Sequence, residues 1–96
     1  MRFEGFDWND DKAARNLAWH GVSFEEATTV FADPLSWTFP DPDHSLGEQR
    51  YLSIGMSTQG RLLMVAHTEQ DDEIRIISAR EATRPERRYY EKSGQR

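Results

Sequence analysis

Polar residues close two strongly apolar segments that the sequence predicts to be strands. His67 ends the segment 61–68, and Ser78 and Arg80 end the segment 73–80. Because strand residues alternate between faces, each of these residues shares its face with apolar neighbours, and the polar ends should gather at one sheet edge or cleft. An imidazole near neutrality can move a proton, and a guanidinium can stabilise an anion. The alternative is structural: a core histidine bonded to a carboxylate, and an arginine that reaches solvent.

A second group of candidates lies in the segment 84–92, where cations and phenols alternate. Arg84 and Arg88 are four residues apart and share a helix face, and Tyr89 and Tyr90 follow them directly. Such a segment could bind phosphate and stack on a base. Its glutamates could equally pair with the arginines along a solvated helix, and both tyrosines could simply cover the sheet.

Metal and nucleophile chemistry finds little support in this sequence. The three histidines, His20, His44 and His67, fall on a predicted helix end, a loop and a strand, with no spacing typical of a zinc site. The chain has no cysteine, no nucleophile elbow and no glycine-rich phosphate loop. We therefore predict no metal and no cofactor.

The charge is unevenly distributed along the chain. Residues 1–79 carry 6 Lys and Arg against 14 Asp and Glu, and residues 80–96 carry 6 against 3, so −8 and +3 sum to the net charge of −5. A polyanion site is therefore expected at the C-terminal end, unless a basic partner covers the acidic body.

Ninety-six residues with a mean hydropathy of −0.84 predict one small domain, spanning 1–92, followed by a frayed tail at 93–96. No apolar run reaches the ~18 residues of a membrane span, and the first residues lack the pattern of a secretory signal. A soluble, cytoplasmic protein is the expectation.

Two helices are predicted in the first third of the chain, after an alternating strand at 2–8. Asn9 caps a helix over 10–20, which has a stripe of alanines and Leu17 and ends at Gly21. Ser23, with a glutamate three residues later, opens a second helix, which ends before Pro34.

The rest of the chain alternates strands and turns. Strands are expected at 35–39, 49–56, 61–68 and 73–80, with a surface loop at 40–47 and a last helix from Thr83 to Lys92. The short turns favour an antiparallel meander with 61–68 in the middle of the sheet. The order β-α-α-β-β-β-β-α describes an α+β domain, a small antiparallel sheet with helices packed on it.

Several blocks resemble the BrnT family, in order and over nearly the whole chain. The two most specific are HGVSFEEA at 20–27 and IRIISAR at 74–80. The others are FDWN at 6–9 with Lys12 and Asn16, FADP at 31–34, EQRY at 48–51 with Ile54 and Gly55, HTE at 67–69, Ala82 with Thr83, and Glu86 with Arg87. The resemblance implies a RelE-like fold and a ribonuclease toxin of a type II toxin–antitoxin pair, neutralised by a DNA-binding BrnA antitoxin.

The resemblance also implies metal-free RNA cleavage, which needs a base for the 2′-OH, a cation for the phosphorane and an acid for the leaving oxygen. The expected catalytic residues are His67 as base or acid, Arg80 and Arg50 as charge stabilisers, and Tyr89 or Tyr90 for stacking or proton donation. The expected RNA-binding residues are Arg61, Ser78, Arg84 and Arg88. No metal or cofactor is expected.

The expected partners are RNA and a ribbon-helix-helix antitoxin of the BrnA type. Operator DNA is expected to bind only through that complex, which could contain a toxin dimer, and no membrane partner is expected. Two alternatives remain: an inert module that binds its antitoxin and serves in autoregulation, and an orphan RNA-binding protein.

Overall fold

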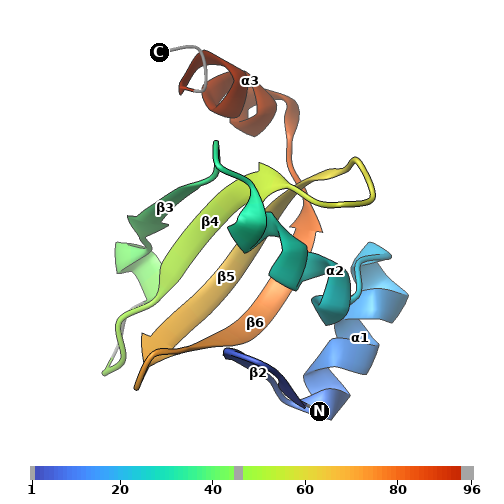
Figure 1. Ribbon diagram of the computed structural model, residues 1–96, viewed down its shortest axis with the longest axis vertical. Helices are drawn as coiled ribbons and strands as arrows, with labels where there is room; N and C mark the ends of the chain where they lie inside the picture. Colours follow the sequence, from blue (N-terminus) through green and yellow to red (C-terminus); the bar gives the residue numbers. More distant parts are fainter. Residues whose placement is uncertain (1, 45–46, 94–96) are drawn as a thin grey trace.

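The computed structural model describes residues 2–44 and 47–93, which form one sheet with helices against it (Figure 1). The strands are β1 Arg2–Phe3, β2 Phe6–Asp7, β3 Trp37–Pro40, β4 Tyr51–Met56, β5 Leu62–Gln70 and β6 Glu73–Glu81. The helices are α1 Asp10–His20, α2 Phe24–Thr29 and α3 Arg84–Ser93, with short 3₁₀ helices η1 Val30–Ala32 and η2 Pro42–His44. The α+β class is confirmed, and the predicted element order holds except at the start, where two short strands replace the one expected.

The sheet has the order β1-β2-β6-β5-β4-β3 and is mixed rather than purely antiparallel. The expected strand at 2–8 is broken by Gly5, whose φ of 81° turns the chain back on itself. As a result β1 and β2 form a short antiparallel pair, and β2 then lies parallel to the start of β6. The remaining neighbours are antiparallel, as the meander predicted.

Strand β5 lies inside the sheet and is buried on both faces over most of its length, as expected. A register shift at Ala66 and His67 interrupts its pairing with β6. Asp71 and Asp72, with φ of 53° and 65°, make the tight turn between these two strands. The expected gathering of the polar strand ends is therefore wrong: because the two strands are antiparallel, Arg80 lies level with Met64 and His67 with Ile76, several residues apart along the hairpin.

Helix α1 begins and ends where the sequence predicts, but it buries a different side. The Asn9 side chain accepts from the Lys12 N–H at 3.0 Å, and Gly21 at φ 70° ends the helix. The expected apolar stripe is only partly right: Ala13 packs against the core, but Leu17 is 51% exposed and the buried residue of the helix is Asn16. The Asn16 amide donates to Ala79 O at 2.8 Å and accepts from the Ala79 N–H at 3.1 Å, so a polar clamp fixes α1 on β6.

Helix α2 starts at the predicted cap, with the Glu26 N–H donating to Ser23 Oγ at 3.0 Å. The Glu26 carboxylate does not close the capping box, because it turns to Ser57 and Arg61. The following η1 lies close against β4 at Gly55, where an added Cβ would stand 2.8 Å from a Val30 methyl carbon. Glycine at this position therefore permits the contact.

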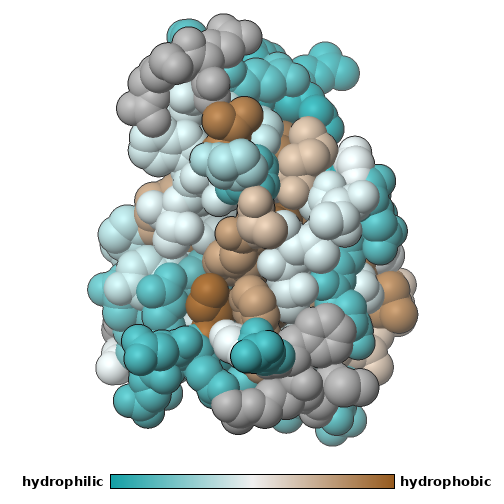
Figure 2. Space-filling view, in the orientation of Figure 1, coloured by the Kyte–Doolittle hydropathy of each residue, from teal (hydrophilic) through white to brown (hydrophobic). Residues whose placement is uncertain are grey.

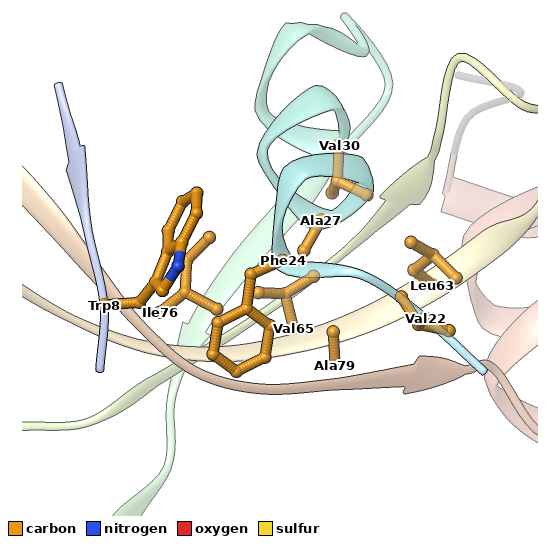
Figure 3. Packing of buried hydrophobic residues seen from close by; sticks show 9 residues of the cluster. All are labelled: Trp8, Val22, Phe24, Ala27, Val30, Leu63, Val65, Ile76 and Ala79. Carbon is orange, nitrogen blue, oxygen red and sulfur yellow. The ribbon is translucent and has the colours of Figure 1, made fainter. Parts of the chain in front are cut away.

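Two apolar clusters lie on the two sides of the sheet. The larger packs α1 and α2 on β5 and β6 and is shown in Figure 3; it contains Trp8, Val22, Phe24, Ala27, Val30, Leu63, Val65, Ile76 and Ala79. The smaller contains Ile54, Leu62, Met64 and Tyr90. Helix α3 supplies Tyr90 and lies beyond the end of the sheet where β4 and β6 finish (Figure 1).

One face of the molecule shows a mixture of hydrophilic and apolar residues (Figure 2). On the face seen in Figure 2, apolar residues appear only in small patches among hydrophilic ones.

The expected loop at 40–47 contains η2, and its residues 45–46 lie outside the described residues. Of the expected tail, Ser93 belongs to α3 and 94–96 lie outside the described residues. No helix among the described residues is long and apolar enough to cross a membrane.

Candidate functional site

The end of β6 and the start of α3 form a corner that holds an ion pair. Arg80 donates two hydrogen bonds to the Glu86 carboxylate, at 2.8 and 2.9 Å. Glu86 also accepts from the Thr83 N–H at 2.8 Å, and the Glu86 N–H donates to Thr83 Oγ1 at 3.4 Å. The capping box predicted at this helix start is thus complete, and its acid is shared with the strand-end arginine.

Hydrogen bonding keeps this pair ionised. The bonds from Arg80 lower the pKa of Glu86 to about 2 against the opposing effect of burial. The bonds to Glu86 in turn raise the pKa of Arg80. The Arg80 guanidinium also donates to Glu81 O at 3.2 Å, and its side chain keeps 41% of its surface exposed, so it can be reached from solvent although it is paired.

An open apolar groove of about 570 Å³ adjoins the pair, between α3 and the second face of the sheet. It is lined by Phe39, Leu52, Ile54, Met64, Pro85, Glu86 and Tyr89. Tyr89 is 48% exposed, and its ring meets those of Trp37 and Phe39 edge-on with centroids 6.3 Å apart. A planar group could lie in this groove beside the ion pair.

Two further predicted residues, Arg84 and Arg88, are exposed on α3 and add positive charge to this corner. Ser78 is half-buried on β6, two residues before Arg80. Arg50 does not lie beside the Arg80–Glu86 pair. Across the sheet, Arg80 is level with Ile54 of β4, and Arg50 precedes Ile54 by four residues. Four strand residues span roughly 13 Å.

His67 lies in the core, with no exposed surface. Its Nε2 is 2.7 Å from Ser53 Oγ, and the Phe31 and Tyr51 rings lie at centroid distances of 5.0 and 5.8 Å. Burial lowers its pKa to about 4, so the ring is neutral near pH 7. His67 is therefore a core histidine, as in the structural alternative, but its hydrogen-bonded partner is Ser53 and not a carboxylate. The ring cannot touch a substrate in this conformation.

Tyr90 also has a structural position. It is 8% exposed, and its hydroxyl donates to Asp33 Oδ2, which also accepts from the Met56 N–H at 2.8 Å. Asp33 Oδ1 accepts from the Leu35 N–H at 2.9 Å. Burial and the bond to Asp33 raise the pKa of Tyr90 to about 12. Tyr90 thus ties α3 to the segment after η1, and Tyr89 is the tyrosine that faces the groove.

Arg61, predicted to bind RNA, is engaged inside the protein. It donates through Nε to Glu26 Oε2 at 3.0 Å, through Nη2 to Glu26 Oε1, and through Nη2 to Gly21 O at 2.9 Å. Ser57 donates to the same carboxylate at 2.7 Å. These contacts lower the pKa of Glu26, chiefly through Arg61, and fix the α1–α2 corner to β5.

The acidic partners were the part of the site that sequence reasoning missed. The sequence predicts helix starts at Ser23 and Thr83, but it does not reveal that Glu26, Glu86 and Asp33 bond side chains from other elements. The capping pattern at Thr83 was the available signal for Glu86. Within residues 2–44 and 47–93, no three His, Cys, Asp or Glu side chains gather as metal ligands would.

Comparison with known proteins adds a family to this geometry. The family model described as "Ribonuclease toxin, BrnT, of type II toxin-antitoxin system" matches residues 8–86. The chain belongs to the BrnT family. This BrnT-family chain is also similar in fold to the crystal structure of the Brucella abortus ribonuclease toxin BrnT. That match has a TM-score of 0.64 and 22% identity, and covers 82% of this chain and 96% of that one. The comparison with curated proteins gives no match.

Proposed function

We propose that this BrnT-family chain is a metal-independent endoribonuclease that acts in the cytoplasm and arrests growth. The family supports a ribonuclease toxin of a type II toxin–antitoxin system. The observation that carries the proposal is the half-exposed Arg80–Glu86 pair beside the groove that Tyr89 lines. The pair lies in the C-terminal segment, where the chain is basic.

The reaction is attack of a ribose 2′-OH on the adjacent phosphorus, which forms a 2′,3′-cyclic phosphate and breaks the bond to the 5′-oxygen. Water takes the 2′-hydroxyl proton, and water supplies the proton that the leaving 5′-oxygen gains. Arg80 stabilises the negative charge that grows on the phosphorane, because its guanidinium is exposed and always charged. Glu86 holds that guanidinium in place from the first turn of α3. Tyr89 stacks on a base, and Arg84 and Arg88 bind flanking phosphates.

A structural alternative to this role is a plain strand-to-helix tie. In that case the pair would only close the corner between β6 and α3, and the chain would be an inert module that binds its antitoxin. The net charge of −5 favours this second function, since an acidic body repels RNA. Activity of the protein alone distinguishes the two.

The antitoxin partner follows from the type II family, and we propose a ribbon-helix-helix protein of the BrnA type. A body with a charge of −8 over residues 1–79 is complementary to a basic partner. In this proposal the complex holds a toxin dimer, and the chain reaches operator DNA only through the antitoxin.

The test is degradation of total RNA by the antitoxin-free protein in EDTA. Retained cleavage in chelator, with growth arrest when the chain is expressed alone, supports the proposal. Arg80→Ala should slow cleavage by about 10²–10³ and relieve the growth arrest. Arg75→Ala is the matched control, because Arg75 is on the same strand and pairs with Asp7. Loss of activity in EDTA that one divalent metal restores would refute metal independence. An inactive wild-type protein that still binds antitoxin would establish the inert module.

A further inference from the structure

A second groove lies on the other side of β6, against α1, and shares no residue with the groove beside α3. It measures about 340 Å³ and is lined by Lys12, Arg15, Asn16, Trp19, His20, Ile77 and Ser78. The groove lies along the part of β6 that β2 does not cover, because β2 pairs with β6 only at Ile74 and Arg75. Helix α1 runs along this part of β6, held there by the Asn16 clamp.

The cations of this groove are available to a ligand. Lys12, Arg15 and Trp19 follow one another at three- and four-residue spacing, so they form one stripe along α1. Both cations are exposed, and the described residues give neither side chain an ion-pair partner within 4.0 Å. By contrast, Arg61 and Arg75 pair with Glu26 and Asp7.

Trp19 offers an open aromatic face beside these charges. Its side chain is 83% exposed, so it adds little to the core. One face is stacked on the His20 ring, with centroids 5.4 Å apart and planes inclined by 4°. This contact orients the indole and leaves the opposite face in solvent. An exposed ring next to unpaired cations is the combination that binds single-stranded nucleic acid without reading its sequence.

We propose that the α1–β6 groove binds a single-stranded stretch of RNA, with a base stacked on Trp19 and phosphates on Lys12 and Arg15. This inference rests on the proposed ribonuclease function and extends its substrate-binding surface. Ser78 lines the groove and precedes Arg80 by two strand residues, roughly 7 Å, so one RNA strand can cross β6 from the groove to the ion pair. In this proposal the α1–β6 groove provides affinity for RNA although the chain is acidic overall, and the Arg80–Glu86 pair acts on the phosphate that is cleaved.

The direct test is binding of a fluorescently labelled ten-nucleotide RNA whose 2′-O-methyl groups prevent cleavage, followed by anisotropy. Trp19→Ala should weaken binding by about tenfold, since losing one stacked base costs on the order of 5- to 150-fold. Trp19→Phe should keep most of the affinity. Lys12→Ala with Arg15→Ala should flatten the slope of log affinity against log salt by about 1.4, roughly 0.7 for each phosphate that is no longer neutralised.

Leu17→Ala is the matched control, because Leu17 is 51% exposed on the same helix and lies outside the groove. Unchanged affinity in Trp19→Ala would overturn the inference. If the Trp19, Lys12 and Arg15 variants lost antitoxin binding but kept their RNA affinity, the groove would be a protein interface, and the inference would also be overturned. Failure of the proposed function is separate: it would appear as absent cleavage by the wild type, whereas these binding measurements need no cleavage.

Discussion

Two regions of the molecule contain an arginine held by a glutamate through two hydrogen bonds, and they differ in what surrounds the pair. Arg61 and Glu26 lie between α2 and β5 with 30% and 2% of their side chains exposed, and Ser57 and Gly21 occupy further polar atoms. Arg80 and Glu86 lie at the β6–α3 corner with 41% and 26% of their side chains exposed. The two arginines are similarly exposed, so the regions differ in the carboxylate, which is buried in one pair and partly exposed in the other.

The largest effect should follow from breaking the buried pair. Arg61→Ala leaves the Glu26 carboxylate buried without its cation, which typically costs about 3–5 kcal/mol. Urea unfolding of the variant should show a loss of this size. Replacing both partners, with Arg61→Met and Glu26→Leu, should restore most of the stability, because no charge then remains buried. Nearly equal stabilities for the wild type and Arg61→Ala would contradict the distinction between the two regions.

The exposed pair should respond in the opposite way. Arg80→Ala should change the free energy of unfolding by no more than about 1 kcal/mol, because exposed ion pairs contribute little. Its RNA cleavage rate should fall by about 10²–10³, the usual cost of removing one donor to a developing anion. Single-turnover cleavage and urea unfolding on the same preparation measure both. If Arg80→Ala lost both stability and activity, the role of Arg80 would be structural and not catalytic.

His67 belongs to the buried region and should control stability at mildly acidic pH. Its pKa is lowered to about 4 in the folded chain, while the unfolded chain takes up a proton near pH 6.5. Its contribution to stability is therefore fully present above pH 6.5 and is lost as the pH falls towards 4, by up to about 3 kcal/mol. His67→Gln should remove this part of the pH dependence. Stability curves that run parallel from pH 7 to 4 would refute a neutral buried ring.

The smallest effect should come from Glu86 in acid. Its pKa of about 2 lies below the ordinary 4.5, so its contribution is present above pH 4.5 and is lost as the pH falls through 2. Solvent screening at this exposed corner keeps the change small. Glu86→Gln should lack this step in thermal unfolding between pH 4.5 and 2, and Glu91→Gln on the outer side of α3 is the control.

The elements were predictable because their signals are local. Caps at Asn9, Ser23 and Thr83 and the meander of β4 to β6 follow from residues a few positions apart. The split at Gly5 was missed, because the alternation of residues 2–8 also fits one continuous strand. The parallel pairing of β2 with β6 depends on residues about 68 positions apart, which periodicity does not address.

The candidate site was harder to predict, because residue type does not reveal burial or partners. Tyr89 and Tyr90 are neighbours, yet one lines a groove and the other bonds Asp33. Arg61 and Arg80 are both strand-end arginines, and only the fold shows which carboxylate each one meets. The groove at Trp19 was missed as an RNA site, because the charge sum over residues 1–79 concealed two cations on one helix stripe.

The position of β6 inside the sheet has a consequence for synthesis of the chain. Helices α1 and α2 pack on β6, and β2 pairs with it, so the first third of the molecule has no complete surface to fold against until residue 81 has been made. Tyr90 must follow before Asp33 gains its last partner. Such long-range pairings form late during translation. We therefore expect the nascent chain to stay unstructured, and the ion pair at Arg80 unformed, until almost the whole domain has left the ribosome.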